Sequence, residues 1–142
     1  MNPQAVRGVK PTSVVPGEAF ADADAAALLR RMQQDLNQIQ RRVRLQIQSQ
    51  LQAFVGQSLG SLERNQALAS AIHAMLDSHG LRVRCTQCGH PAILRVSSRK
   101  SMPSGAFVFD HTLDGKRTFH GGTAVVPELK LNAKPSRRRP AG

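Results

Sequence analysis

The chain of 142 residues is long enough for one small domain with appendages, or for two very small units. It contains no Trp, no Tyr and only five Phe, so large apolar anchors for a core are scarce and a bound metal or partner would help to stabilise the fold. The formal net charge of +11 favours an acidic partner such as nucleic acid, and no run of about 18 apolar residues is present that could span a membrane.

After a Pro- and Gly-containing lead over residues 1–21, which we expect to be flexible, residues 22–55 predict one long helix. Asp22 or Asp24 can cap its start, and no Gly or Pro interrupts it. Its apolar residues recur every three or four positions and therefore share one face. A helix of about 30 residues is roughly 45 Å long, which is more than a domain this small covers, so the face predicts a second copy, a helical protein partner or residues 61–79 folded back. The predicted oligomerisation residues are Leu29, Met32, Leu36, Ile39, Val43, Ile47, Leu51 and Phe54.

A second helix is predicted over residues 61–79. Gly56 and Gly60 interrupt the first pattern, and Ser61 is a suitable N-cap residue. Gly80 is expected to end the second helix as a left-handed residue. Residues 22–80 are therefore predicted to form a helical arm.

From residue 81 the apolar period changes to two, which is typical of strands. We expect strands over 81–85, 93–96 and 106–111, with a polar loop over 97–104. Asp114-Gly115 predicts a type I′ hairpin turn into residues 116–120. Gly121-Gly122 is expected to turn the chain towards an edge strand within 125–131, before a disordered basic tail over 133–142. The predicted fold class is α+β, with a small antiparallel β unit over residues 81–132.

Cys85-Thr86-Gln87-Cys88-Gly89 holds the only two cysteines of the chain. A C-x-x-C-G turn points both sulfurs to one side and supplies half of a tetrahedral metal site, so histidines must supply the other half. Pairing across the predicted hairpin turn sets His111 opposite Thr118 and places His120 on the same face, at a diagonal distance of about 7–8 Å. The predicted ligands are Cys85, Cys88, His111 and His120, with His90 as a substitute for either histidine.

Thiolate and imidazole ligands together favour Zn²⁺ over magnesium or calcium. Four protein ligands leave no open position for water, which favours a structural site over a catalytic one. A redox C-x-x-C is the other interpretation of the motif, but that chemistry favours a cysteine at a helix N-terminus, and here a strand follows. With no export signal in the first 16 residues, we expect reduced cysteines and a cytoplasmic or nucleoid-associated location.

The cysteine turn and the histidine hairpin together resemble a zinc ribbon, in which two ligand-bearing turns face each other across short strands. The resemblance covers roughly residues 83–122 and rests on the first knuckle, since the second cysteine pair of a ribbon is absent. It implies a small zinc-stapled β unit. Asp110-His111 followed by Gly121-Gly122 also resembles, over barely a dozen residues, the Asp-His and Gly-Gly of HNH nucleases, although a hairpin ending in Gly-Gly accounts for the same residues.

The positive charge is concentrated beside the cysteines, because residues 81–142 carry 12 basic and 3 acidic side chains, against 8 and 6 in residues 1–80. We therefore expect a non-enzymatic zinc protein that binds nucleic acid or a nucleoprotein complex, without a membrane or a small-molecule substrate. The alternative function is that of a protein–protein adaptor that acts through the long helix, with zinc purely structural. A small HNH-like nuclease is the second alternative. The predicted nucleic-acid-binding residues are Arg82, Arg84, Arg95, Arg99, Lys100, Lys116, Arg117, Arg137, Arg138 and Arg139.

Overall fold

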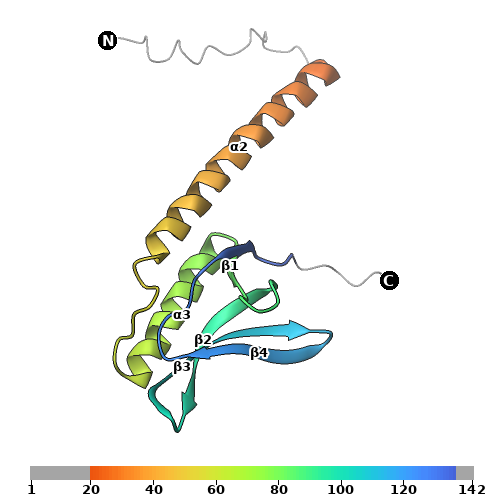
Figure 1. Cartoon of the computed structure of the whole chain (residues 1–142). Helices are drawn as coiled ribbons and strands as arrows, with labels where there is room; N and C mark the ends of the chain where they lie inside the picture. Colours follow the sequence, from red (N-terminus) through yellow and green to blue (C-terminus); the bar gives the residue numbers. More distant parts are fainter. Residues whose placement is uncertain (1–19, 137–142) are drawn as a thin grey trace, which may run out of the picture. The chain divides into compact units, whose positions relative to one another are not determined.

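The computed structural model describes residues 20–136, and the rest of the chain, including Arg137, Arg138, Arg139 and most of the predicted lead, lies outside the described residues. The described part has the predicted α+β class: two helices precede a five-stranded antiparallel sheet (Figure 1). The sheet order is β4-β3-β2-β1-β5. The elements are α2 (Asp22–Leu51), α3 (Leu62–Ser78), β1 (Leu81–Arg84), β2 (Pro91–Arg99), β3 (Met102–Leu113), β4 (Lys116–Thr123) and β5 (Leu131–Ala133).

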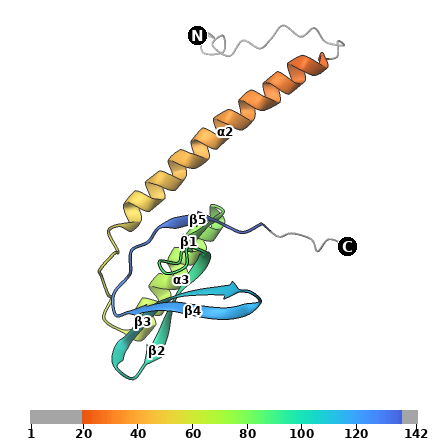
Figure 2. The same ribbon diagram turned by 45° about the vertical axis from the view of Figure 1, so that its right-hand side comes forward.

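Helix α3 begins and ends where the sequence predicted. The Ser61 hydroxyl accepts a hydrogen bond from the Arg64 N–H at 3.2 Å, which satisfies one of the free donors of the first turn. Gly80 follows the helix with a φ of +70°. The buried face of α3 packs against β1, β2 and β3 (Figure 2).

Because α3 packs on the sheet, the compact units do not divide at residue 80, where the predicted helical arm ends. One unit ends at Arg42 and the other begins at Val43, so the last turns of α2, all of α3 and the sheet form one unit. Its core contains residues from every one of these elements except β4. The buried core residues are Leu51, Ala69, Ile72, Leu76, Leu81, Val83, Cys85, Ala92, Leu94, Val96, Phe107, Phe109, Val126, Leu129 and Leu131.

The apolar face of α2 is divided between these two units. The predicted oligomerisation residues Leu29, Met32, Leu36, Ile39 and Val43 are exposed. Two other predicted oligomerisation residues are not available to contact a partner. Leu51 is 3% exposed and lies in the core, and Ile47 packs against it; including them in an oligomerisation surface was wrong. Phe54 lies beyond the end of the helix and is 37% exposed. Among the described residues, no helix combines the length and apolarity needed to cross a membrane.

The hairpin prediction at Asp114-Gly115 is confirmed in its register. Leu113 pairs with Lys116, and the pairs that follow are Thr112 with Arg117 and His111 with Thr118. Asp114 and Gly115 have φ of +50° and +79°, as both central residues of a type I′ turn require.

Other strand predictions need correction. Residues 97–104 are not a loop, because β2 and β3 pair until Arg99 meets Met102 and leave only a short turn between them. Gly121 and Gly122 do not turn the chain; they lie inside β4, where Gly121 pairs with Val108. A strand can include them because the missing side chains permit their positive φ.

The predicted edge strand over 125–131 is displaced towards the C-terminus. Pro127 has no N–H for a ladder, and instead Val126 exchanges backbone hydrogen bonds of 2.8 and 2.9 Å with Gly56 and Gln57. The strand forms later, as β5, beside β1 (Figure 2). The predicted tail therefore starts too early: Ala133 belongs to β5, and the Lys134 N–H donates to the Gly80 carbonyl at 2.8 Å.

Candidate metal centre

The cysteine turn connects β1 to β2. The Gly89 N–H donates to the Cys85 carbonyl and the Cys85 N–H donates to the His90 carbonyl, both at 2.9 Å. This turn brings both sulfurs to the same side of the loop, as the C-x-x-C-G spacing predicted. Cys85 is buried, Cys88 is half-buried, and both are free cysteines. Burial raises the pKa of the Cys88 thiol above its ordinary value.

The two histidines come from neighbouring strands. His111 of β3 pairs with Thr118 of β4, and His120 lies two residues further along β4, on the same face. The Cys88 sulfur lies 3.0 Å from His111 Nε2, and the Cys85 sulfur lies 3.3 Å from His120 Nδ1. Ligand atoms of all four residues lie within 4.8 Å of one another. A tetrahedral zinc site separates sulfur and nitrogen ligands by about 3.5 Å, so this cluster could hold a metal ion.

Hydrogen bonds from outside the cluster fix its geometry. His111 Nδ1 donates to the Thr118 carbonyl at 2.8 Å. In the neutral imidazole this bond selects the tautomer with its proton on Nδ1, so that Nε2, which lies beside the Cys88 sulfur, is the nitrogen that could bind a metal. Gln87 accepts from the Gly121 N–H at 2.8 Å, and Asn132 donates to the Gly89 carbonyl at 2.9 Å. These two side chains hold the cysteine turn against β4 and β5.

Gln87 and Asn132 were missed by the sequence analysis. The position of Gln87 between the two cysteines was a signal that its side chain had to lie near the site. Asn132 gave no signal, because its contact depends on β5 pairing with β1.

The structure selects among the three candidate histidines. His90 is exposed and contributes only its backbone carbonyl to the cysteine turn, so the described residues bring together Cys85, Cys88, His111 and His120 without it. Both ligand histidines lie on strands, whereas a zinc ribbon would carry its second ligand pair on a turn. The ligand set agrees with the prediction, and the second half of the site departs from the ribbon pattern.

The opposite face of the same strands carries an ionic cluster. Asp110 is only 7% exposed and accepts from Arg95 at 2.6 Å and from Arg117 at 2.9 and 3.1 Å. Arg117, and secondly Arg95, hold the pKa of the Asp110 carboxyl below its ordinary value. Phe119 is 51% exposed, and the Arg117 guanidinium lies 5.1 Å from the centre of its ring. We call Arg95, Asp110, Arg117 and Phe119 the arginine face.

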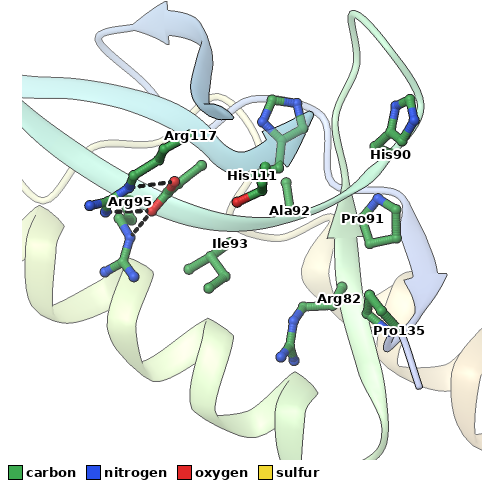
Figure 3. A pocket seen from close by; sticks show the side chains of 11 residues that line it. Arg82, His90, Pro91, Ala92, Ile93, Arg95, His111, Arg117 and Pro135 are labelled. Carbon is green, nitrogen blue, oxygen red and sulfur yellow. Dashed lines mark hydrogen bonds and ion pairs between the residues drawn. The ribbon is translucent and has the colours of Figure 1, made fainter. Parts of the chain in front are cut away.

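A cavity of about 560 Å³ opens beside the arginine face. Figure 3 shows the guanidinium groups of Arg95 and Arg117 converging at the dashed lines, with Arg82 on the other side of Ile93. Arg82 is not free in this cavity, because Asp77 of α3 accepts a hydrogen bond from it. The cavity is therefore lined by arginine side chains on either side of the apolar Ile93. Asp110 and Asp77 neutralise part of the positive charge of these arginines.

The remaining predicted nucleic-acid-binding residues lie in three places. Arg84 donates to the Asn132 side chain at 2.9 Å. Arg99 and Lys100 are at the turn between β2 and β3, and Lys116 is at the turn between β3 and β4. Within residues 20–136, no ion pair is formed by Arg99, Lys100 or Lys116.

Comparison with protein-family models, with curated proteins and with solved structures finds no match for this chain.

Proposed function

We propose that Cys85, Cys88, His111 and His120 bind a structural Zn²⁺ ion, and that the basic unit held together by this ion binds nucleic acid. The choice of zinc rests on the ligand set, since two thiolates with two imidazoles match its preferred tetrahedral sites. A catalytic role is not proposed, because four protein ligands would leave no position for water or substrate. The ion would supply stability that a core with few large residues lacks.

The observation that favours nucleic acid is the arginine face. Asp110 fixes two guanidinium groups in place while Arg95 and Arg117 remain 50% and 63% exposed. Fixed guanidinium groups can present their outer N–H donors to phosphate oxygens. Phe107 and Phe109 are in the core, but Phe119 is 51% exposed and its ring, which already contacts Arg117, could also stack with a base. An unpaired strand offers both phosphates and accessible bases, so single-stranded nucleic acid fits this face best.

Two measurements test the proposal. Elemental analysis of the purified protein should find about one zinc per chain, and none in the Cys85→Ser variant. Fluorescence anisotropy with labelled oligonucleotides of about 20 nucleotides should show binding whose affinity falls by orders of magnitude between about 50 and 200 mM salt. Zinc-loaded protein that binds neither DNA nor RNA at the lower salt concentration would refute the nucleic-acid part alone.

Matched variants locate the binding surface. Lys116→Ala removes an exposed charge beside Arg117, whereas Lys130→Ala removes another exposed charge, one that pairs with Glu128 at 3.6 Å. We expect only Lys116→Ala to weaken binding and to lower the slope of the salt dependence by about one. Phe119→Ala should weaken binding to single strands more than to duplex, since base stacking contributes about 1–3 kcal/mol per base.

A second function, that of a protein–protein adaptor, is supported by the exposed apolar residues of α2. In that case zinc would only hold the fold, and association would depend on helix pairing with another copy or a helical protein. Helix pairing through apolar contacts should hardly respond to salt, whereas phosphate binding should respond steeply. The two functions are thus separable by the same salt titration, carried out on the oligonucleotide complex and on the protein assembly.

A further inference from the structure

In the segment of α2 from Leu29 to Val43, the apolar side chains are not buried against any other element. Every residue from 28 to 43 is exposed, and the exposed fractions of Leu29, Met32, Leu36 and Ile39 are 65%, 50%, 50% and 52%. An isolated helix gains little stability from propensity alone and depends on packing of its apolar face. This segment therefore needs a partner that covers one narrow apolar stripe.

The stripe has the spacing of a coiled coil. Leu29, Leu36 and Val43 repeat every seven residues, and Met32 and Ile39 lie three residues after the first two of them. In heptad terms these are successive a and d positions, whose knobs fit into the holes of another helix. The other described helix cannot supply that partner, because the apolar face of α3 is already buried against the sheet. Among the described residues no helix is left to cover the stripe, and the same segment of a second chain offers a matching one.

The charges beside the stripe indicate which chain and which direction. The residue before each a position lies at g, and here Asp35 and Arg42 are at g while Gln33 and Gln40 are at e. In a parallel pair g faces e of the other helix, so Asp35 would meet a glutamine. In an antiparallel pair g faces g, and Asp35 of each copy would meet Arg42 of the other.

The apolar layers agree with that same register. When Asp35 faces Arg42 of a second copy, Leu36 packs against Ile39 of that copy, and Val43 packs against its Met32. Gln33 and Gln40 then face each other on the opposite flank. We infer that residues 32–43 pair with the same segment of a second copy in antiparallel orientation, with the reciprocal Asp35–Arg42 contacts setting the register. The inference does not depend on the bound metal or on nucleic-acid binding.

A charge-exchange experiment on the full-length protein tests the inference. Sedimentation equilibrium should show a reversible dimer of the wild type. Asp35→Arg and Arg42→Asp should each raise the dissociation constant on the order of tenfold, because each turns two attractive pairs into repulsive ones. The double variant Asp35→Arg/Arg42→Asp should restore wild-type association, since it exchanges the two charges across both pairs.

Two further variants serve as controls. Arg41→Asp makes the same substitution one residue away, at an f position facing solvent, and should leave the dissociation constant unchanged. Ile39→Gln places a polar side chain in the stripe and should abolish the dimer. Metal content and oligonucleotide affinity in dilute solution check that the folded unit is intact in every variant. A strict monomer at high concentration, a double variant that stays weak, or single variants without effect would each overturn the inference.

Discussion

Asp110 and His111 are consecutive residues of β3 that point to opposite faces of the sheet. Asp110 accepts hydrogen bonds from Arg95 and Arg117, whereas His111 directs Nε2 to the sulfur of Cys88. Alternation along a strand makes this separation unavoidable. A single strand thus contributes one residue to the metal cluster and the next residue to the arginine face.

The two residues should consequently give different phenotypes. His111→Ala removes a ligand, so we expect loss of bound metal and unfolding of the sheet. Asp110→Asn should keep one metal per chain and lose about 1–3 kcal/mol of stability, because hydrogen bonds to a charged acceptor are weakened. Elemental analysis and urea denaturation of both variants measure this. Metal loss in Asp110→Asn equal to that in His111→Ala would show that the two faces are not independent.

Removal of the metal should affect more than the strands. Since α3 shares a core with β1 and β2, we expect a chelator to expose the amides of α3 and of residues 81–133 together. The amides of residues 22–42 belong to the other compact unit and should exchange as before. Hydrogen exchange by mass spectrometry, with and without chelator, distinguishes these segments. Unchanged protection of α3 in metal-free protein would contradict the shared core.

Gly105 is predicted to be intolerant of any side chain. A Cβ at this position would lie 2.5 Å from Val96 Cγ1, 2.7 Å from Leu62 Cδ1 and 3.1 Å from the Ser97 carbonyl oxygen, whereas one at Gly56 would meet nothing within 4 Å. Their φ angles, +83° and +81°, are nearly equal, so Gly56→Ala is a matched control for backbone strain.

We expect Gly56→Ala to cost about 1–2 kcal/mol from its backbone conformation. Gly105→Ala should cost a further 1–3 kcal/mol, roughly, from overpacking between α3 and the sheet. Urea denaturation of metal-saturated protein measures both costs. Equal destabilisation of the two variants would mean that the neighbours of Gly105 move aside freely.

The ion pairs of Asp77 should make a contribution that does not vary between pH 5 and pH 8. Lys134, and secondly Arg82, lower the pKa of the Asp77 carboxyl to about 2 from 3.8. A carboxyl with a lowered pKa stabilises the folded state above its unfolded pKa, and the stabilisation is lost as pH falls towards the folded value. Asp77→Asn should therefore lower the urea midpoint by the same small amount at pH 5 and pH 8. High salt should shrink the difference. No difference at either pH would show that the pairs do not form, and a difference present at pH 8 but absent at pH 5 would contradict the lowered pKa of Asp77.

Local sequence chemistry was sufficient to predict three members of the candidate metal cluster, Cys85, Cys88 and His111, and to propose the fourth. Asp114-Gly115 fixed the turn type and therefore the register of β3 and β4, and the register placed His111 and His120 on one face. The C-x-x-C-G spacing fixed the cysteine turn in the same way. The selection of His120 over His90 was not decided by local chemistry, because it required the fold to bring β4 over the cysteine turn.

Features that depend on long-range packing were not predictable from the sequence. Nothing local distinguishes Leu51, which enters the core, from Leu36, which stays exposed; the difference is that the core unit begins at Val43. The polar residues of 97–104 resemble a loop, yet they pair because β2 and β3 continue as one hairpin to Arg99 and Met102. Likewise, the pairing of Arg95 and Arg117 with Asp110 required the register of three strands.

The strand order leaves β4 and β5 at the two margins of the sheet, where exposed backbone groups invite the strands of other molecules to add on. β5 is only three residues long, and β4 begins with Lys116 and Arg117 and contains two glycines. A very short edge strand such as β5, and an edge strand with charged residues and an irregular backbone such as β4, both hinder pairing with strands of other molecules. These two margins should therefore resist the edge-to-edge joining of sheets from different molecules, even where the protein is concentrated.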